Sequence, residues 1–222
     1  MRSPLPFFAL LLGCAHAELP PTAAAALARP ADAWGTHIYT GIVTPAGADA
    51  PAFRYERRVH DNPDGTRVST HVTWVGQGSG QGSREVPIVV QRATQDAQGS
   101  LLAYDEVHAQ RGKAYHYDGG DRIVGPTLFE FVRRHLPQLR AGEVVPLRFW
   151  DRGSSYRFEL RLAGDTVQMR ARNPIIRRAI APMQLRLGAD DEIVAYHGRI
   201  PPLVDGHAVD AASTYEYFAA FR

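Results

Sequence analysis

The sequence predicts a mainly β protein in which a curved antiparallel sheet packs over one amphipathic helix. Segments of alternating apolar and polar residues recur along the chain, and this is the period of a half-buried strand. Turn-forming residues separate many of these segments, and only one stretch has helical periodicity. The 222 residues are 45% hydrophobic and 22% charged, which is the composition of a folded chain with a sizeable core.

The first segment, residues 1–17, has the pattern of a secretory signal peptide. Met1-Arg2 supplies a positive start, and the apolar stretch 5–13 is far shorter than the ~20 residues that span a bilayer as a helix. Ala15-His16-Ala17 fits a small-x-small cleavage site, so the mature chain is expected to begin at Glu18. We therefore expect a bacterial periplasmic or secreted protein.

Lipidation is the alternative for this segment. Leu11-Leu12-Gly13-Cys14 resembles the bacterial lipobox, in which the cysteine is acylated and the chain becomes a membrane-anchored lipoprotein. Otherwise the thiol is lost with the signal peptide. Cys14 is the only cysteine, so an internal disulfide and a cysteine-rich zinc module are both excluded.

The domain organisation is simple. Residues 18–35 are rich in proline and alanine and are predicted to form a linker. Residues 36–222 contain no internal repeat and no composition shift, so we expect a single β-rich domain with about ten to twelve strands.

The clearest element is a hairpin over residues 155–172. Apolar and charged residues alternate on both sides of a two-residue turn, Gly164-Asp165. Glu159 then lies opposite Arg170, which is a favourable cross-strand pair. The register predicted for the apolar face is Leu162–Val167, Leu160–Met169 and Phe158–Ala171.

The other strands show the same period. Residues 53–59 and 68–74 are two strands separated by Asn62-Pro63-Asp64-Gly65, which is strong turn chemistry. Residues 102–109 and 113–118 form a hairpin around Arg111-Gly112, and closing it there pairs His108 with Tyr115. Shorter candidate strands are 37–43, 86–93, 144–150, 183–187, 192–200 and 214–218.

The one predicted helix covers residues 126–140. Leu128, Phe129, Val132 and Leu136 lie close to one face, and Pro137 is expected to end or kink the helix. The segment 76–83, GQGSGQGS, is expected to be a mobile loop.

Motifs for catalysis, metal binding and cofactor binding are mostly missing. Segment 76–83 matches neither phosphate-binding fingerprint, and the nine histidines show no metal-ligand spacing on a helix. His108 and His116 fall on opposite faces of their hairpin. Paired carboxylates such as Asp118 and Asp121 have the context of turns. We therefore predict no catalytic residue, no metal and no cofactor, and the net charge of +2 argues against nucleic acid as a partner.

Four arginines share one face of the 155–172 hairpin: Arg157, Arg161, Arg170 and Arg172. In the cell envelope such a face could contact lipid phosphates at a membrane surface. A solvated outer face, whose positive charge is partly compensated by Glu159, is the more common explanation of such a pattern.

Aromatic residues indicate where a ligand could bind. Tyr104, Tyr115 and Tyr117 share one face of their predicted hairpin. The residues expected to line a ligand site are Tyr104, Tyr115, Tyr117, Phe129, Phe149, Tyr156 and Phe158. Two outcomes are open: the curved sheet encloses an apolar cavity for a lipid or other apolar molecule, or the helix fills it.

The stretch 117–199 resembles a bacterial envelope family known only as a domain of unknown function. The matching pieces are the helix 125–140, Ala141-Gly142-Glu143 with strand 144–149, and the hairpin 156–169. The proline-led strand 180–185 and the terminal strand 193–198 follow. The resemblance implies a half-barrel around a helix, similar to the lipoprotein carriers of the Lol system, and it implies no catalytic residue.

The sequence therefore favours a non-catalytic exported envelope protein that binds a lipid or other apolar ligand in its half-barrel. One alternative is a structural or assembly factor that acts through its β-edge or its basic face. A less favoured alternative is a hydrolase whose site combines distant residues such as His197, Asp105 and Tyr117.

Overall fold

The computed structural model describes residues 21–29, 31–46, 52–76, 86–179 and 181–219. The predicted signal peptide, Cys14 and nearly all of the predicted loop 76–83 lie outside these residues. Within the described residues, no helix is long and apolar enough to cross a membrane.

In the part of the chain that the structure describes, the fold is one antiparallel sheet of twelve strands, which agrees with the predicted ten to twelve. The sheet order is β6-β5-β4-β3-β2-β1-β12-β11-β10-β9-β8-β7. Strands that follow each other in the chain are therefore neighbours in the sheet, except β6 and β7 at its two edges, and the first strand pairs with the last. The strands are β1 Thr36–Pro45, β2 Phe53–Asp61, β3 Arg67–Val75, β4 Val89–Gln95, β5 Leu101–His108, β6 Lys113–Tyr117, β7 Val145–Asp151, β8 Ser154–Ala163, β9 Thr166–Ala171, β10 Met183–Leu187, β11 Ile193–Val204 and β12 His207–Tyr217.

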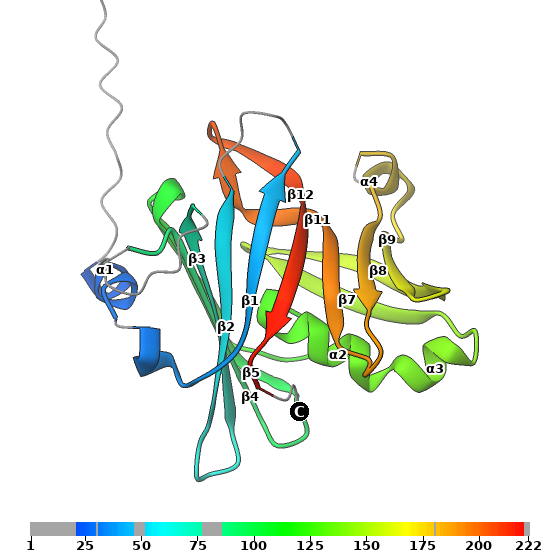
Figure 1. Ribbon diagram of the computed structural model, residues 1–222, viewed down its shortest axis with the longest axis horizontal. Coiled ribbons are helices and arrows are strands. Elements are labelled where there is room, and N and C mark those ends of the chain that lie inside the picture. Colours follow the sequence, from blue (N-terminus) through cyan, green and yellow to red (C-terminus); the bar gives the residue numbers. More distant parts are fainter. Residues whose placement is uncertain (1–20, 30, 47–51, 77–85, 180, 220–222) are drawn as a thin grey trace, which may run out of the picture.

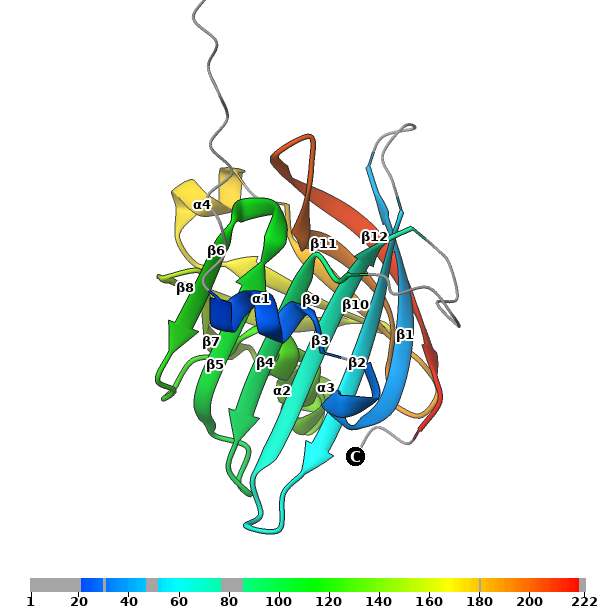
Figure 2. The ribbon, with the colours of Figure 1, turned by 90° about the vertical axis from the view of Figure 1, so that its left-hand side faces the viewer.

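The sheet curls around the helices (Figure 1), and its two edge strands, β6 and β7, approach each other (Figure 2). They do not pair directly. Ile123, which follows β6, bridges to Phe149 in β7, and the peptide N–H of Trp150 donates to the carbonyl of Ile123 at 2.9 Å. The rings of Tyr117 and Trp150 stack across the same seam. The half-barrel is therefore held at its seam by a short connection rather than by a continuous ladder.

The hairpin of β8 and β9 has the predicted register. Phe158 pairs with Ala171, Leu160 with Met169, and Glu159 with Arg170. The predicted register of β5 and β6 is wrong by two residues, because His108 pairs with Lys113 and Glu106 with Tyr115. The cause is a longer turn, in which Ala109–Arg111 form a 3-10 turn before Gly112. A shift of two keeps every side chain on its predicted face.

The predicted helix is broken into three pieces: a 3-10 turn at Gly125–Thr127 (η3), α2 at Leu128–Arg134 and α3 at Leu136–Arg140. Pro137 accounts for the break after α2, because proline in a helix interior clashes with the preceding turn. The helices run along the inside of the curved sheet (Figure 2). Their apolar face and the strands β7 to β11 form the main core, which includes Leu128, Phe129, Val132, Leu136, Leu139, Val145, Leu147, Phe158, Leu160, Met169, Leu185 and Ile193.

The predicted linker 18–35 differs from what the structure shows. Pro21–Leu27 form helix α1, which lies across the outer face of β3 to β5, and Ala31–Trp34 form a 3-10 turn beside β2 (Figure 2). Alanine is the strongest helix former, which accounts for the helix. Its packing has an apolar partner: Ala23, Leu27 and Trp34 form a core cluster with Val72, Trp74, Val90 and Val107. This stretch therefore covers the sheet.

One further helix, α4 at Pro174–Ala179, is absent from the sequence prediction. It follows β9 directly. The side chain of Asn173 begins it by accepting the peptide N–H of Ile175 at 2.8 Å, which is the usual role of an asparagine at a helix N-cap.

Candidate functional site

The predicted ligand-lining aromatic residues fall into two groups. Tyr104, Tyr115 and Tyr117 pack with Trp150 near the seam. Phe129, Phe149, Tyr156 and Phe158 belong to the main core or pack against it. Side chains of α2 and α3 occupy the apolar half-barrel, so of the two open outcomes the structure has the filled one. A role of these seven residues in ligand binding stays a prediction.

The residues of the hydrolase hypothesis are not brought together. Asp105 is exposed and bonds to Nδ1 of His116 at 2.8 Å, whereas Tyr117 faces Trp150. His197 is exposed on β11, which five strands separate from β5 in the sheet. The His116 imidazole also contacts Asp118 at 2.8 Å, and its two carboxylate partners raise its pKa.

A second group of polar residues lies buried on the inner face of β2 to β5, and the sequence analysis does not identify it. Arg57 is fully buried in β2 and donates to the carbonyl of Pro126 at 2.6 Å and to the hydroxyl of Ser69 at 3.0 Å. It also forms an ion pair with Glu130 of α2. This guanidinium therefore anchors the start of the inner helix to the sheet.

His71 lies beside Arg57 in the next strand. Its Nδ1 is hydrogen-bonded to the hydroxyl of Tyr55, and its Nε2 is 3.4 Å from the Arg57 guanidinium. Burial, together with the charge of Arg57, holds the pKa of His71 well below its usual value. The imidazole is therefore neutral and adds no second positive charge beside the ion pair of Arg57 and Glu130.

The network continues into β4 and β5. Gln91 donates to the hydroxyl of Tyr104 at 2.8 Å and to Oε2 of Glu106 at 3.0 Å, and Tyr104 donates to the same oxygen at 2.7 Å. Burial raises the pKa of Glu106 despite these hydrogen bonds. His108 lies two residues further along the strand and contacts the carbonyl of Pro201 at 2.9 Å, and its burial lowers its pKa to about 4.

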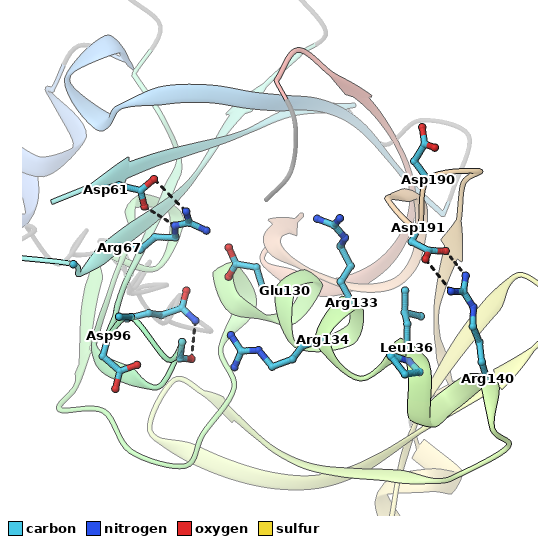
Figure 3. A pocket seen from close by; sticks show the side chains of 15 residues that line it. Asp61, Arg67, Asp96, Glu130, Arg133, Arg134, Leu136, Arg140, Asp190 and Asp191 are labelled. Atoms are coloured by element: carbon cyan, nitrogen blue, oxygen red, sulfur yellow. Dashed lines mark hydrogen bonds and ion pairs between the residues drawn. The ribbon is translucent and has the colours of Figure 1, made fainter. Parts of the chain in front are cut away.

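A charged cleft of about 660 Å³ opens at one end of the half-barrel (Figure 3). Its walls come from four segments: the β2–β3 turn, the β4–β5 turn, helices α2 and α3, and the β10–β11 turn. The lining residues are Asp61, Gly65, Arg67, Gln95, Asp96, Ala97, Gly99, Glu130, Arg133, Arg134, Leu136, Pro137, Arg140, Asp190 and Asp191. None of the seven predicted ligand-lining residues is among them.

The predicted basic face is exposed and larger than the hairpin alone. Arg157, Arg161, Arg170 and Arg172 are all exposed, and Arg148 and Arg186 of the neighbouring strands extend the same face. Arg148 lies directly opposite Arg157, and the peptide N–H of Arg172 donates to the carbonyl of Arg157 at 2.9 Å. These three arginines form a row across β7, β8 and the end of β9.

Helix α4 lies at the end of this face (Figure 1). Its Arg177 and Arg178 are exposed, and Ile175 is 79% exposed, more than any other large apolar side chain among the described residues. The sequence patterns do not predict this helix, so they do not indicate that an exposed isoleucine lies close to arginines here.

Metal binding has no candidate here. Among the described residues, no group of three or more histidine, cysteine, aspartate or glutamate side chains could hold a metal ion.

The comparisons with known proteins give a likeness of structure and none of sequence. No family model matches the chain, and no curated protein matches its sequence. Among solved structures, the chain is similar to a beta-barrel-like protein of a domain of unknown function (DUF1849) from Brucella abortus. The TM-score is 0.45 at 9% identity, with 84% of this chain and 99% of that chain covered. The resemblance to the Lol carriers stays a prediction.

Proposed function

We propose that this protein is an exported, non-catalytic envelope protein that docks on an anionic membrane surface through the arginine face. We define this face as the six residues Arg148, Arg157, Arg161, Arg170, Arg172 and Arg186. The single observation that carries the proposal is the exposed row of Arg148, Arg157 and Arg172.

The row is unfavourable for the fold itself. Like charges directly opposite each other on neighbouring strands destabilise a sheet. Strands lie about 4.8 Å apart, so the three guanidinium groups repel one another at close range. An array of phosphates removes this repulsion, because guanidinium groups bind phosphate oxygens in a bidentate fashion.

Few carboxylates compensate the face. Strands β7 to β10 contain two, Asp151 and Glu159. Asp151 is paired with Arg152, while Glu159 bonds to Nε of Arg161 at 3.2 Å. Asp121, outside these strands, lies 3.2 Å from Arg148. The face therefore keeps a clear positive excess, and each basic residue near an anionic bilayer contributes about 1 kcal/mol to binding.

Helix α4 adds an apolar contact. Ile175 projects from the helix beside Arg177 and Arg178. Basic residues flanking an exposed apolar side chain are typical of segments that lie at the headgroup boundary of a bilayer. The alternative of a lipid carried inside the half-barrel needs an apolar cavity, and α2 and α3 occupy that space.

Vesicle sedimentation tests the proposal. The protein carries Cys14→Ser, so that no acyl chain contributes, and is mixed with vesicles of phosphatidylcholine alone or with added phosphatidylglycerol. We expect binding to the anionic vesicles, weakened by salt. The triple variant Arg148→Gln, Arg157→Gln, Arg172→Gln should bind about a hundredfold more weakly, because three contacts of ~1 kcal/mol are lost.

A matched control removes three positive charges elsewhere. Arg29, Arg92 and Lys113 are exposed and lie outside the arginine face. Their triple substitution with glutamine should leave most of the binding intact. Equal binding of both triple variants, or equal binding of the parent to neutral and anionic vesicles, would contradict the proposed function.

A further inference from the structure

We propose that the charged cleft binds a short peptide with free termini, a molecule with a positive group at one end and a negative group at the other. The proposal is independent of membrane docking, since no residue of the arginine face lines the cleft. Figure 3 shows how its side chains converge from separate segments.

The cleft has the size of a small-molecule site. Its volume of about 660 Å³ lies within the range of about 300–1,000 Å³ that ligand sites occupy. Leu136 and Pro137, where the inner helix breaks, supply an apolar part of the lining. The remaining lining is mainly polar and charged, which disfavours a lipid and favours a charged ligand.

Most of the cleft's charges are already compensated by ion pairs. Arg67 binds Asp61 through two contacts, at 2.6 and 3.1 Å. Arg140 binds Asp191 in the same bidentate fashion. Glu130 is paired with Arg57 beneath the cleft.

The carboxylate of Asp96 accepts the peptide N–H groups of Gln98 and Ser100 at 2.9 and 2.7 Å. Two opposite charges among the described lining residues have neither kind of contact. Within the described part of the chain, the structure records no hydrogen bond or ion pair for the guanidinium of Arg134 or for the carboxylate of Asp190. Arg134 projects from α2 toward the β4–β5 turn, whereas Asp190 lies in the β10–β11 turn on the other side (Figure 3). The cleft therefore presents a positive group and a negative group on different walls.

Gly99 leaves room for the head group of Arg134. A Cβ at Gly99 would overlap the guanidinium of Arg134, and the φ of +80° at this glycine also disfavours other residues. The side chain of Arg134 thus lies against the β4–β5 turn, where its guanidinium is available to a carboxylate.

A short peptide matches this arrangement. Its carboxylate would bind Arg134, its ammonium group would bind Asp190, and its middle would lie over Leu136 and Pro137. Charge-assisted hydrogen bonds of this kind are about twice as strong as neutral ones. Arg133 also extends into the cleft and favours the negative end of a ligand (Figure 3).

Isothermal titration calorimetry with three probes tests the proposal. The probes are trialanine, N-acetyl-trialanine, which lacks the ammonium group, and trialanine amide, which lacks the carboxylate. We expect saturable binding of trialanine to the full chain, and about tenfold weaker binding of each capped probe.

Two variants assign the ends of the peptide. In Arg134→Gln, trialanine and its amide should bind with equal Kd, because the partner of the carboxylate is lost. In Asp190→Asn, trialanine and the acetylated probe should bind with equal Kd. The control Arg161→Gln, on the arginine face, should keep both preferences.

Three results would overturn the proposal. They are the absence of saturable trialanine binding up to about 10 mM, equal affinity of the parent protein for all three probes, and an undiminished preference for the free terminus in the corresponding variant. Circular dichroism of each variant verifies that the fold is retained, and the comparison of probes within one variant does not depend on its stability.

Discussion

The two halves of the sheet place their polar residues on opposite faces. In β7 to β10, apolar side chains such as Leu160 pack on the inner helices and arginines face outward. In β2 to β5, Arg57, His71 and Glu106 are buried on the inner face, while Val72 and Val90 lie on the outer face under α1. The difference shows that the element covering a face, more than the strand itself, decides which face is apolar.

The two halves of the sheet are stabilised by different interactions. The apolar half relies on burial, which is non-directional and tolerates small adjustments. The polar half relies on a network in which each buried group needs a partner, so loss of one member leaves others unsatisfied. Mutations should therefore affect the two halves in different ways.

The largest effect is expected for Arg57→Ala. The substitution leaves the half-buried carboxylate of Glu130 without this partner and removes the anchor of Pro126. Breaking a buried ion pair in this way costs about 3–5 kcal/mol, measurable as a lower free energy of unfolding in urea. The double variant Arg57→Met, Glu130→Gln should recover part of this loss. A loss below about 1 kcal/mol for Arg57→Ala would show that the polar half does not depend on this pair.

A smaller effect is expected from pH. The pKa of His108 is about 4 in the folded protein, against about 6.5 in an unfolded chain. Between these two pH values the unfolded state binds a proton at this residue and the folded state does not. The free energy of unfolding should thus fall between pH 7 and pH 4, by about 2 kcal/mol from this residue.

His108→Gln isolates this contribution. The variant should show a shallower dependence of stability on pH, and the exposed His207→Gln, as a control, should keep the dependence of the parent. Identical pH profiles for the parent and His108→Gln would mean that burial of this imidazole does not control acid stability.

The smallest effect on stability is expected on the arginine face. Arg157→Gln removes the repulsion with Arg148 across β7 and β8. The free energy of unfolding should rise by a few tenths of a kcal/mol, within the range of about 0.2–1 kcal/mol for cross-strand pairs. A decrease of similar size would indicate that this arginine stabilises the sheet, which would weaken the argument that the row is kept for binding.

Much of the fold follows from local patterns. The alternation in residues 155–172 and the turn Gly164-Asp165 determine the register of β8 and β9, because both faces agree on one alignment. The β5–β6 register is less determined, since a one-turn 3-10 segment and a two-residue turn are both compatible with the sequence around Gly112. Helix α4 is too short for its periodicity to be recognised.

The site is much less predictable. The cleft joins four segments between residues 61 and 191, and no local pattern indicates that Arg134 and Asp190 face the same space. The row of Arg148, Arg157 and Arg172 is equally hard to predict, because it depends on the pairing of β7 with β8, which lies outside the predicted hairpin. Four members of the arginine face, Arg157, Arg161, Arg170 and Arg172, are nevertheless placed on one side of the sheet by the alternation alone.

The sequence by itself determined which residues share a strand face, where the chain turns and where the inner helix breaks. These are local properties, because a strand has a period of two and proline interrupts a helix wherever it occurs. Only the tertiary structure decided which face of each strand is inside, which segment covers the outer face of β3 to β5, and which charges meet in the cleft. These depend on contacts between residues far apart in the chain. The free energy gained by burying an apolar face is non-directional, so the strand pattern alone does not specify which segment covers it.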